Sequence, residues 1–258
     1  MNSKERKLNK FYDSIEHSLS IIAYYCVHLL TVLLFILSSF NIIPQYNLIY
    51  PISSLNNICI QSINWYCFFC IEYFLIKCKN TSKNKISFRY YSFKRTGYCK
   101  ICCKEKYFRV HHCKTCNSCT LRMDHHCSWM NCCIGLHNIR YFYLFLLYGT
   151  IVTITNFSKI ALILYYHSLI PNFSFVPSLV GLCISFSCGI SLLILLLVQT
   201  IFISFNCTTI ECLQFISSLS SGLIYKNKFK KSLWKNWCEA FLIEDHQWQL
   251  PIKFLPLN

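Results

Sequence analysis

The chain alternates long apolar runs with strongly polar segments. Four of the runs reach the roughly 20 residues that a helix needs to cross the hydrocarbon core of a membrane. They occupy residues 21–40, 55–76, 141–165 and 179–205. The second run is the least apolar because it contains Gln61, Asn64 and Glu72, and polar groups in a membrane span usually face the bundle interior. The pattern therefore predicts an all-α polytopic membrane protein with four transmembrane helices.

A basic head, with Lys4, Arg6, Lys7 and Lys10, precedes the first apolar run. Such a head is also typical of a cleaved signal peptide. The run is longer than the apolar part of a signal peptide, and no A-x-A cleavage pattern follows it. We therefore expect a retained first membrane helix.

Lysine and arginine residues predict the orientation of the four helices. Four precede the first helix, fourteen lie in residues 77–140 and six lie in residues 226–253, whereas the connections 41–54 and 167–178 contain none. Positively charged residues favour cytosolic loops. The expected divisions are a cytosolic N-terminus (1–20), helices one and two (21–76), a cytosolic domain (77–140), helices three and four (141–205) and a cytosolic C-terminal region (206–258).

The overall composition supports the same interpretation. Hydrophobic residues make up 54% of the 258 positions, charged residues make up 14%, and the mean hydropathy is +0.39. These values are typical of a membrane protein. The net charge of +15 therefore reflects the positive bias of cytosolic loops, and no nucleic-acid partner is expected.

Residues 99–133 hold nine of the nineteen cysteines and four of the nine histidines. The strongest pattern is two pairs, Cys99-x2-Cys102 and Cys113-x2-Cys116, because two intervening residues let both thiolates of a pair bind one ion. A disulfide framework is not expected, since the segment should face the reducing cytosol. Six cysteines and two histidines would make two closed Cys3His zinc sites. The best candidates to complete them are Cys119, Cys133, His112 and His126.

Cys127 is the thiol that these two sites leave over. In an extended stretch alternate side chains share a face, so His125 and Cys127 point one way and His126 the other. His125 is then placed to take the thiol proton, while Asp124 orients the imidazole as in a catalytic triad. The alternative is that Cys127 is a ninth, redundant metal ligand.

These residues resemble the DHHC family of protein S-acyltransferases (palmitoyltransferases). The sequence Asp124-His125-His126-Cys127 is followed by Trp129, Asn131, Cys133 and Gly135, and the similarity extends from Cys99 to Phe142. Two shorter motifs follow the fourth run in the family's order. They are Thr208-Thr209-Ile210-Glu211, which resembles the TTxE motif, and Asn227-x-Phe229 with Asn236-Trp237 and Phe241, which resembles the C-terminal motif.

The resemblance implies four membrane helices, with a cytosolic zinc-binding domain of loops and short hairpins between the second and third. It implies one zinc site of Cys99, Cys102, His112 and Cys119 and another of Cys113, Cys116, His126 and Cys133. It also implies catalysis by Asp124, His125 and Cys127, with support from Thr209 and Glu211. The sequence departs from the family pattern at Tyr107, Ser128 and Cys132, where proline, proline and asparagine are usual, and it lacks the DPG motif.

The expected activity is two-step thioester exchange. Cys127 attacks a long-chain acyl-CoA, and the acyl group, palmitoyl, then passes to a cysteine of a protein substrate close to the membrane lipid. The expected location is an endomembrane such as the ER or Golgi. The cations available for the CoA phosphates are Arg109, Lys114, Arg122 and Arg140.

Small residues on the third helix leave room for an acyl chain among the helices, or serve ordinary helix packing; they are Gly149, Thr150, Val152 and Thr153. The stripe Gly181-x3-Ser185-x3-Gly189 on the fourth helix is interpreted as packing.

Two other functions use the same metal ligands. A membrane-anchored RING-like zinc module would recruit partners without needing Asp124, His125 or a free Cys127. A pseudoenzyme would carry a broken triad, whereas this triad is whole.

Overall fold

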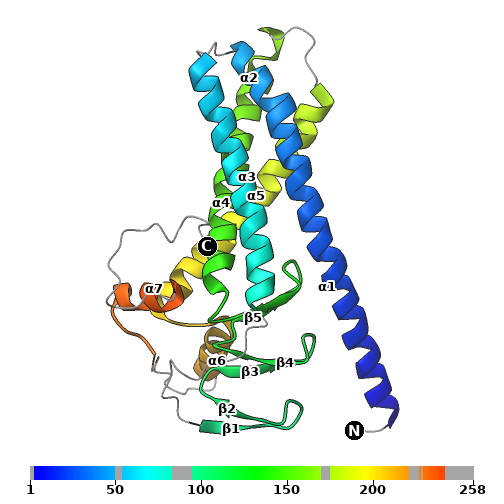
Figure 1. Cartoon of the computed structure of the whole chain (residues 1–258), viewed down its shortest axis with the longest axis vertical. Coiled ribbons are helices and arrows are strands. Elements are labelled where there is room, and N and C mark those ends of the chain that lie inside the picture. Colours follow the sequence, from blue (N-terminus) through cyan, green and yellow to red (C-terminus); the bar gives the residue numbers. More distant parts are fainter. Residues whose placement is uncertain are drawn as a thin grey trace. The chain divides into compact units, whose positions relative to one another are not determined.

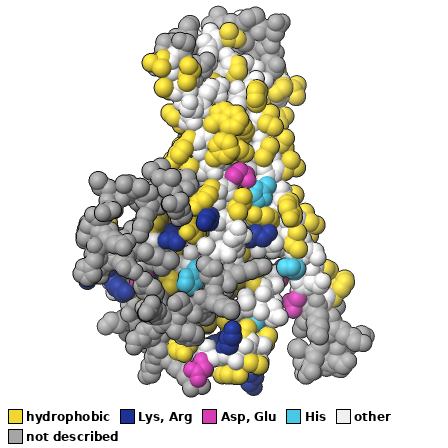
Figure 2. All heavy atoms as spheres, viewed as in Figure 1, with side chains coloured by type: hydrophobic (Ala, Val, Ile, Leu, Met, Phe, Trp, Pro, Cys, Tyr) yellow, Lys and Arg dark blue, Asp and Glu magenta, His cyan; other side chains and the backbone are white. Residues whose placement is uncertain are grey.

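The computed structural model describes residues 3–49, 54–82, 95–169, 175–220, 227 and 229–241. Four long helical stretches dominate it: α1 (Ser3–Leu37) continuing into α2 (Ile43–Ile49), then α3 (Ser54–Thr81), α4 (Ile139–Tyr165) and α5 (Phe175–Phe205) (Figure 1). The parts long and apolar enough to cross a membrane are Phe11–Ile49, Ile58–Thr81, Ile139–Tyr165 and Phe175–Phe205. Each contains most or all of one predicted span. On the face seen in Figure 2, hydrophobic side chains cover these helices, as expected of surface that meets lipid.

The first helical stretch is longer than its predicted span of residues 21–40. It passes through a π-helical turn, Ser38–Ile42, and ends at Ile49, so most of the predicted connection 41–54 is helical. In the π-helical turn the amide of Ile43 donates to the carbonyl of Ser38, five residues back. Pro44 follows directly, and proline has no amide to donate and clashes with the preceding turn of a regular α-helix. The wider turn lets the chain stay helical past the proline.

The described chain forms two compact units. One contains the described residues of 1–26, 75–142 and 199–252, and the other contains those of 27–74 and 143–198. In the second unit, polar side chains bond one another between helices. Ser38 donates to Asn64 at 3.3 Å and to Asn156 at 3.0 Å, and Asn64 donates to Ser39 at 2.8 Å. These bonds join α3, α4 and the π-helical turn.

Three glycines of the third and fourth predicted helices lie close to neighbouring helices. A Cβ atom on Gly149 would come within 3.0 Å of Leu192, and one on Gly189 within 3.3 Å of Thr153. A Cβ on Gly181 would come within 2.7 Å of Leu37. The stripe on α5 therefore serves close helix packing, as predicted.

The first unit contains three antiparallel hairpins between α3 and α4 (Figure 1). They are β1 (Arg95–Cys99) with β2 (Lys104–Tyr107), β3 (Val110–Cys113) with β4 (Ser118–Leu121), and β5 (His125–Cys127) with β6 (Cys132–Ile134). Each hairpin turn ends in a residue with positive φ, namely Cys103 at 50°, Asn117 at 48° and Asn131 at 47°. Asparagine tolerates this backbone region better than most residues, which suits it to two of the turns.

Few large aliphatic side chains hold the hairpins together. Val110, Leu121 and Leu136 form one small buried cluster. Gly135 lets the chain after β6 approach β4, since a Cβ there would lie 2.7 Å from the carbonyl oxygen of Leu121. A core this small stabilises three short hairpins only weakly, so other interactions must hold them.

Two shorter helices follow α5 in the first unit: α6 (Thr209–Ser220) and α7 (Leu233–Phe241). Asn236 is fully buried and donates to the carbonyl of Ser204 at 2.8 Å, while the indole of Trp237 donates to the Ser204 hydroxyl at 3.2 Å. Asn227 donates to the carbonyl of Phe205 at 2.8 Å. Three of the residues resembling the C-terminal motif therefore bind the last turn of α5. The rest of the predicted C-terminal region, after Phe241, lies outside the described residues.

Candidate active site and metal centres

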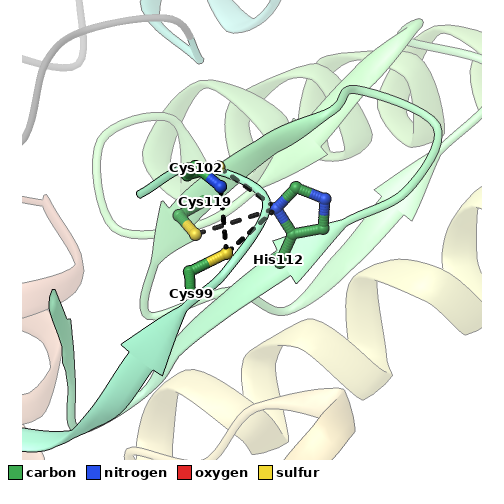
Figure 3. A group of neighbouring side chains, drawn as sticks. All are labelled: Cys99, Cys102, His112 and Cys119. Atoms are coloured by element: carbon green, nitrogen blue, oxygen red, sulfur yellow. Dashed lines mark hydrogen bonds between the residues drawn. The ribbon is translucent and has the colours of Figure 1, made fainter. Parts of the chain in front are cut away.

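Two groups of three cysteines and one histidine lie within the hairpins. In each group the four ligand atoms lie within 4.8 Å of one another. The groups are those predicted, Cys99, Cys102, His112 and Cys119 (Figure 3) and Cys113, Cys116, His126 and Cys133.

The hairpins explain how each group is assembled. The turn of one hairpin supplies a CxxC pair, in which the amide of Cys102 donates to the sulfur of Cys99 at 3.5 Å. The next hairpin supplies a histidine and a cysteine that face each other across its strands, His112 opposite Cys119. The second group repeats the arrangement one hairpin later. Each group thus takes two ligands from a hairpin turn and two from facing positions on the strands of the next hairpin.

The spacing of the ligand atoms fits a tetrahedral ion. With Zn–S of about 2.3 Å and Zn–N of about 2.0 Å, sulfur and nitrogen ligands lie about 3.5 Å apart around tetrahedral zinc. From Nδ1 of His112 the three sulfurs lie at 3.6, 3.2 and 3.8 Å, and from Nδ1 of His126 they lie at 3.7, 3.3 and 3.8 Å. Both groups can therefore hold a metal ion, and their donor atoms are those that zinc prefers.

The second ring nitrogen of His126 also has a partner, which no pattern in the sequence predicts. Its Nε2 lies 3.4 Å from the hydroxyl of Ser20, a fully buried residue of α1. The same hydroxyl donates to the carbonyl of Ser128 at 3.2 Å. A hydrogen bond from the outer nitrogen of a ligating histidine fixes the orientation of its ring.

The extended backbone of β5 turns its two adjacent histidines to opposite sides of the strand. His126 turns its Nδ1 into the second metal group, whereas the Nδ1 of His125 lies 2.7 Å from Oδ2 of Asp124. Cys127 follows His126 on the same strand; it is buried and belongs to neither metal group. The structure therefore brings together Asp124, His125 and a cysteine that neither group needs as a ligand.

The carboxylate of Asp124 is buried and receives hydrogen bonds from three directions. Besides His125, the backbone amide of Thr209 donates to Oδ1 at 2.6 Å and the side-chain amide of Gln199 donates to Oδ2 at 3.0 Å. Burial alone would raise the pKa of Asp124, but these hydrogen bonds and the charge of His125 outweigh it and lower the pKa. The carboxylate is thus held ionised, as an orienting group for His125 must be.

Neighbouring groups set the pKa of the His125 imidazole. Burial would lower its pKa, but hydrogen bonds and charge interactions with Asp124 and Cys127 raise the pKa to about 9. The ring also packs edge-on against Phe142, with 5.4 Å between centroids. An imidazole in this setting readily holds a proton taken from the neighbouring thiol.

The residues resembling the TTxE motif form a helix cap at the start of α6. The amide of Glu211 donates to the hydroxyl of Thr208 at 3.3 Å, and the amide of Thr208 donates to the carboxylate of Glu211 at 2.9 Å. This reciprocal pair is a capping box. The cap aims the amide of Thr209 at Asp124, so Thr209 supports the acid through its backbone rather than through its side chain.

Glu211 also makes a buried ion pair with Arg109. Its two oxygens lie 2.7 Å from Nε and 2.8 Å from Nη2 of the guanidinium. Arg109 further donates to the side chain and carbonyl of Asn206 at 2.8 and 3.1 Å and stacks on Phe229 at 4.4 Å. The expectation that Arg109 binds a CoA phosphate is therefore corrected, because this buried guanidinium is already committed within the fold.

The other three expected phosphate-binding cations differ in exposure. Lys114 is exposed on the turn after β3, whereas Arg122 is buried with its Nη1 4.0 Å from Glu239. Arg140 is half-buried and donates to the carbonyl of Phe241 at 3.1 Å. A phosphate-binding role for these three stays a prediction.

Gln199 and Ser20 were not predicted as site residues. Gln199 is a polar residue within the apolar run 179–205, and polar residues in membrane helices often mark functional positions. For Ser20 the sequence carries no such signal. The amide of Thr209 could be anticipated in part, since Thr208-x-x-Glu211 fits the capping-box pattern.

Part of the chain that contains these residues resembles a known protein family. Residues 92–216 match the family model described as DHHC palmitoyltransferase. No curated protein matches the chain. The matched residues include both metal groups, Asp124, His125 and Cys127, and the start of α6, so the resemblance seen in the sequence is confirmed. This chain thus carries a DHHC palmitoyltransferase domain, which makes it an enzyme of the protein S-acyltransferase class.

Proposed function

We propose that the protein transfers a long-chain acyl group, palmitoyl, from acyl-CoA to cysteine thiols of proteins close to a membrane. The observation that carries the proposal is the 2.7 Å contact between Asp124 and His125, with the carboxylate fixed by Thr209 and Gln199. This pair lies on the strand that also carries Cys127. A nucleophile, a base and an orienting acid are therefore assembled in one place.

In the first step His125 takes the proton of the Cys127 thiol. The thiolate attacks the carbonyl carbon of the acyl-CoA thioester, a new C–S bond forms, and the bond to the CoA sulfur breaks. CoA leaves as a thiolate that takes the proton back from His125. In the second step His125 takes the proton of an acceptor cysteine, whose sulfur attacks the thioester carbonyl. The bond to the Cys127 sulfur breaks, and Cys127 leaves as a thiolate that takes the proton back from His125.

The two metal groups have a structural role and take no part in the acyl transfer itself. Each offers four protein ligands, which leaves no open position, so a Zn²⁺ ion in either is structural. We assign two zinc ions, one to each group. Since β5 carries both His126 and Cys127, ligation of His126 fixes the strand that presents the nucleophile.

We propose that both termini and the hairpins face the cytosol, where CoA is found, in an endomembrane such as the ER or Golgi. The sorting of lysine and arginine along the sequence supports this orientation. Lys114, the exposed member of the expected cations, is our first candidate for a CoA phosphate contact.

The experiment is acyl-enzyme formation with matched variants on one strand. Purified protein in detergent is incubated with labelled palmitoyl-CoA, the adduct is tested for cleavage by hydroxylamine, and bound zinc is counted. Cys127→Ser and His125→Ala should keep about two zinc ions and form no adduct, because neither residue is a proposed ligand.

Cys133→Ser and His126→Ala serve as controls, because each removes a ligand but no catalytic group. Each should lose one zinc ion and destabilise the domain by several kcal/mol, on the scale of about 10–16 kcal/mol for structural zinc. A hydroxylamine-sensitive adduct on Cys127→Ser, or zinc loss from it, would refute the assignment of Cys127 as a free nucleophile. Absence of any adduct on the wild type, with zinc present, would favour a RING-like module or a pseudoenzyme.

A further inference from the structure

Two buried thiols that the proposed mechanism does not use lie next to the nucleophile. Cys132 is directly opposite Cys127 in the β5–β6 pair. The thiol of Cys132 donates at 3.8 Å to the backbone carbonyl of Cys78, in the last turns of α3. Asn138 joins the two, since its amide nitrogen lies 3.8 Å from the sulfur of Cys132 and 3.1 Å from the carbonyl oxygen of Cys78. Cys127, Cys132 and Cys78 thus form a continuous row of three thiols.

None of the three belongs to either metal group. Their exposed fractions fall along the row, from 7% at Cys127 to 2% at Cys132 and 0% at Cys78. A small oxidant from solution therefore reaches Cys127 before the other two. Cys132 also stands where the DHHC family pattern has asparagine, so the row is a feature of this chain rather than of that pattern.

The geometry suits formation of a disulfide between neighbours in the row. Residues directly opposite in an antiparallel pair have Cβ atoms about 4.5–5.5 Å apart, and a disulfide needs about 3.5–4.5 Å. The pair lies at the turn end of a short hairpin, where a small closure of the strands meets the difference. Cys78 is likewise close to Cys132, since its carbonyl oxygen lies 3.8 Å from the sulfur of Cys132.

We propose that Cys132 is a resolving thiol, so that Cys127 and Cys132 form a peroxide-responsive modification site with Cys78 as its final acceptor. Hydrogen peroxide transfers one oxygen to the Cys127 thiolate, giving a sulfenic acid and hydroxide. The Cys132 thiol then attacks that sulfur, an S–S bond forms and water leaves. Overall two thiols are oxidised by two electrons, and one peroxide is reduced to water.

The disulfide can then move along the row. The sulfur of Cys78 attacks that of Cys132, the Cys78–Cys132 bond forms, and Cys127 leaves as a thiolate that receives the proton of Cys78. The nucleophile is regenerated while the oxidation is stored in the two most buried thiols. Trapping the sulfenic acid as a disulfide protects Cys127 from the sulfinic state, which thiol reductants do not reverse. The reactivity of Cys127 in this scheme rests on the proposed function.

The test is disulfide mapping in the full-length, zinc-loaded protein after brief treatment with hydrogen peroxide. Free thiols are blocked, and the chain is cut by trypsin and then at Trp129, which separates Cys127 from Cys132. Cys132 and Cys133 share the fragment 130–140, so the linked fragments are sequenced by tandem mass spectrometry, which should place the bond between Cys132 and either Cys127 or Cys78. Peroxide-induced bonds that involve the ligand Cys133 instead, with release of zinc, would overturn the proposal.

Activity provides the second measurement. After peroxide and then dithiothreitol, the wild type should recover most of its acyl-enzyme formation, whereas Cys132→Asn should recover little because its Cys127 reaches the sulfinic state. Cys132→Asn places the family's usual residue there, so it should fold and be active before peroxide. Cys212→Ser, which removes a half-buried thiol of α6, is the control and should recover like the wild type. Equal recovery in Cys132→Asn and the wild type would overturn the proposal.

These measurements separate the two proposals. Acyl-enzyme formation before peroxide tests the proposed function alone. Wild-type disulfide mapping tests the row of thiols alone, and it stands even if Cys132→Asn fails to fold.

Discussion

Replacing Glu211 by alanine should be the most damaging change in the segment that resembles the TTxE motif. The variant removes the carboxylate that pairs with Arg109, whose side chain is only 4% exposed, and it also removes half of the capping box at the start of α6. Breaking a buried ion pair by deleting one partner costs about 3–5 kcal/mol. Asn206 and Phe229 still contact the guanidinium, so the lower end of that range applies.

The neighbouring threonines provide a graded comparison. Thr208→Ala loses the hydroxyl that caps the helix, which is worth about 1 kcal/mol. Thr209→Ala keeps the backbone amide that reaches Asp124, so its stability should change by no more than about 0.5 kcal/mol and its activity little. In a chain of this size about 1 kcal/mol shifts the melting temperature by about 2–4 °C. The expected losses are thus about 6–12 °C for Glu211→Ala, about 2–4 °C for Thr208→Ala and within about 2 °C for Thr209→Ala.

The assay is thermal unfolding of the three variants in one detergent, followed by circular dichroism, together with the rate of acyl-enzyme formation. The double variant Arg109→Met with Glu211→Met should melt above Glu211→Ala, since it leaves no unpaired buried charge. The reasoning is refuted if Thr209→Ala loses as much stability or activity as Glu211→Ala. That result would mean that the Thr209 side chain, rather than its amide, supports the acid.

Three further predictions follow from contacts in the same unit and from the sequence. Gln199→Leu removes a charge-assisted hydrogen bond worth about 1.5–3 kcal/mol, so acyl-enzyme formation should slow about tenfold or more with zinc unchanged; an unaltered rate would argue against this role. Ser20→Ala should weaken zinc binding at the group containing His126 by about 10–100-fold in chelator competition, whereas Ser18→Ala, an exposed serine bonded to its own helix, should not. A glycosylation acceptor engineered into residues 167–178 should be modified and tags at both termini should be accessible from the cytosol; a lumenal C-terminus would contradict the four-span orientation.

The helices were largely predictable because their signal is local. Runs of about 20 apolar residues specify a membrane helix whatever the rest of the chain does. The first helix differed at both ends, since it begins at Ser3 and a π-helical turn carries the chain past Pro44 to Ile49. A proline is normally a reason to end a helix, and the wider turn depends on neighbours that the sequence does not reveal.

The metal-binding groups and the opposite directions of His125 and His126 were also predictable, because they depend on local geometry. A CxxC turn and the period of two along a strand place each ligand without reference to distant residues. Membership of the two groups follows from the order of the hairpins, so the sequence sufficed to name all eight ligands.

The tertiary structure decided which distant residues surround Asp124. The partners of Asp124 are 75 and 85 residues away along the chain, and those of Arg109 and His126 are about as distant, at 102 and 106. Such contacts exist only because α1, α5 and α6 return to the hairpins, and no local pattern encodes which residue arrives there. By itself the sequence predicted the elements, the two groups of candidate metal ligands, and a candidate nucleophile with its base. The fold alone decided that Thr209 acts through its amide, that Arg109 is structural and that Cys78 meets Cys132, because each depends on where distant segments meet.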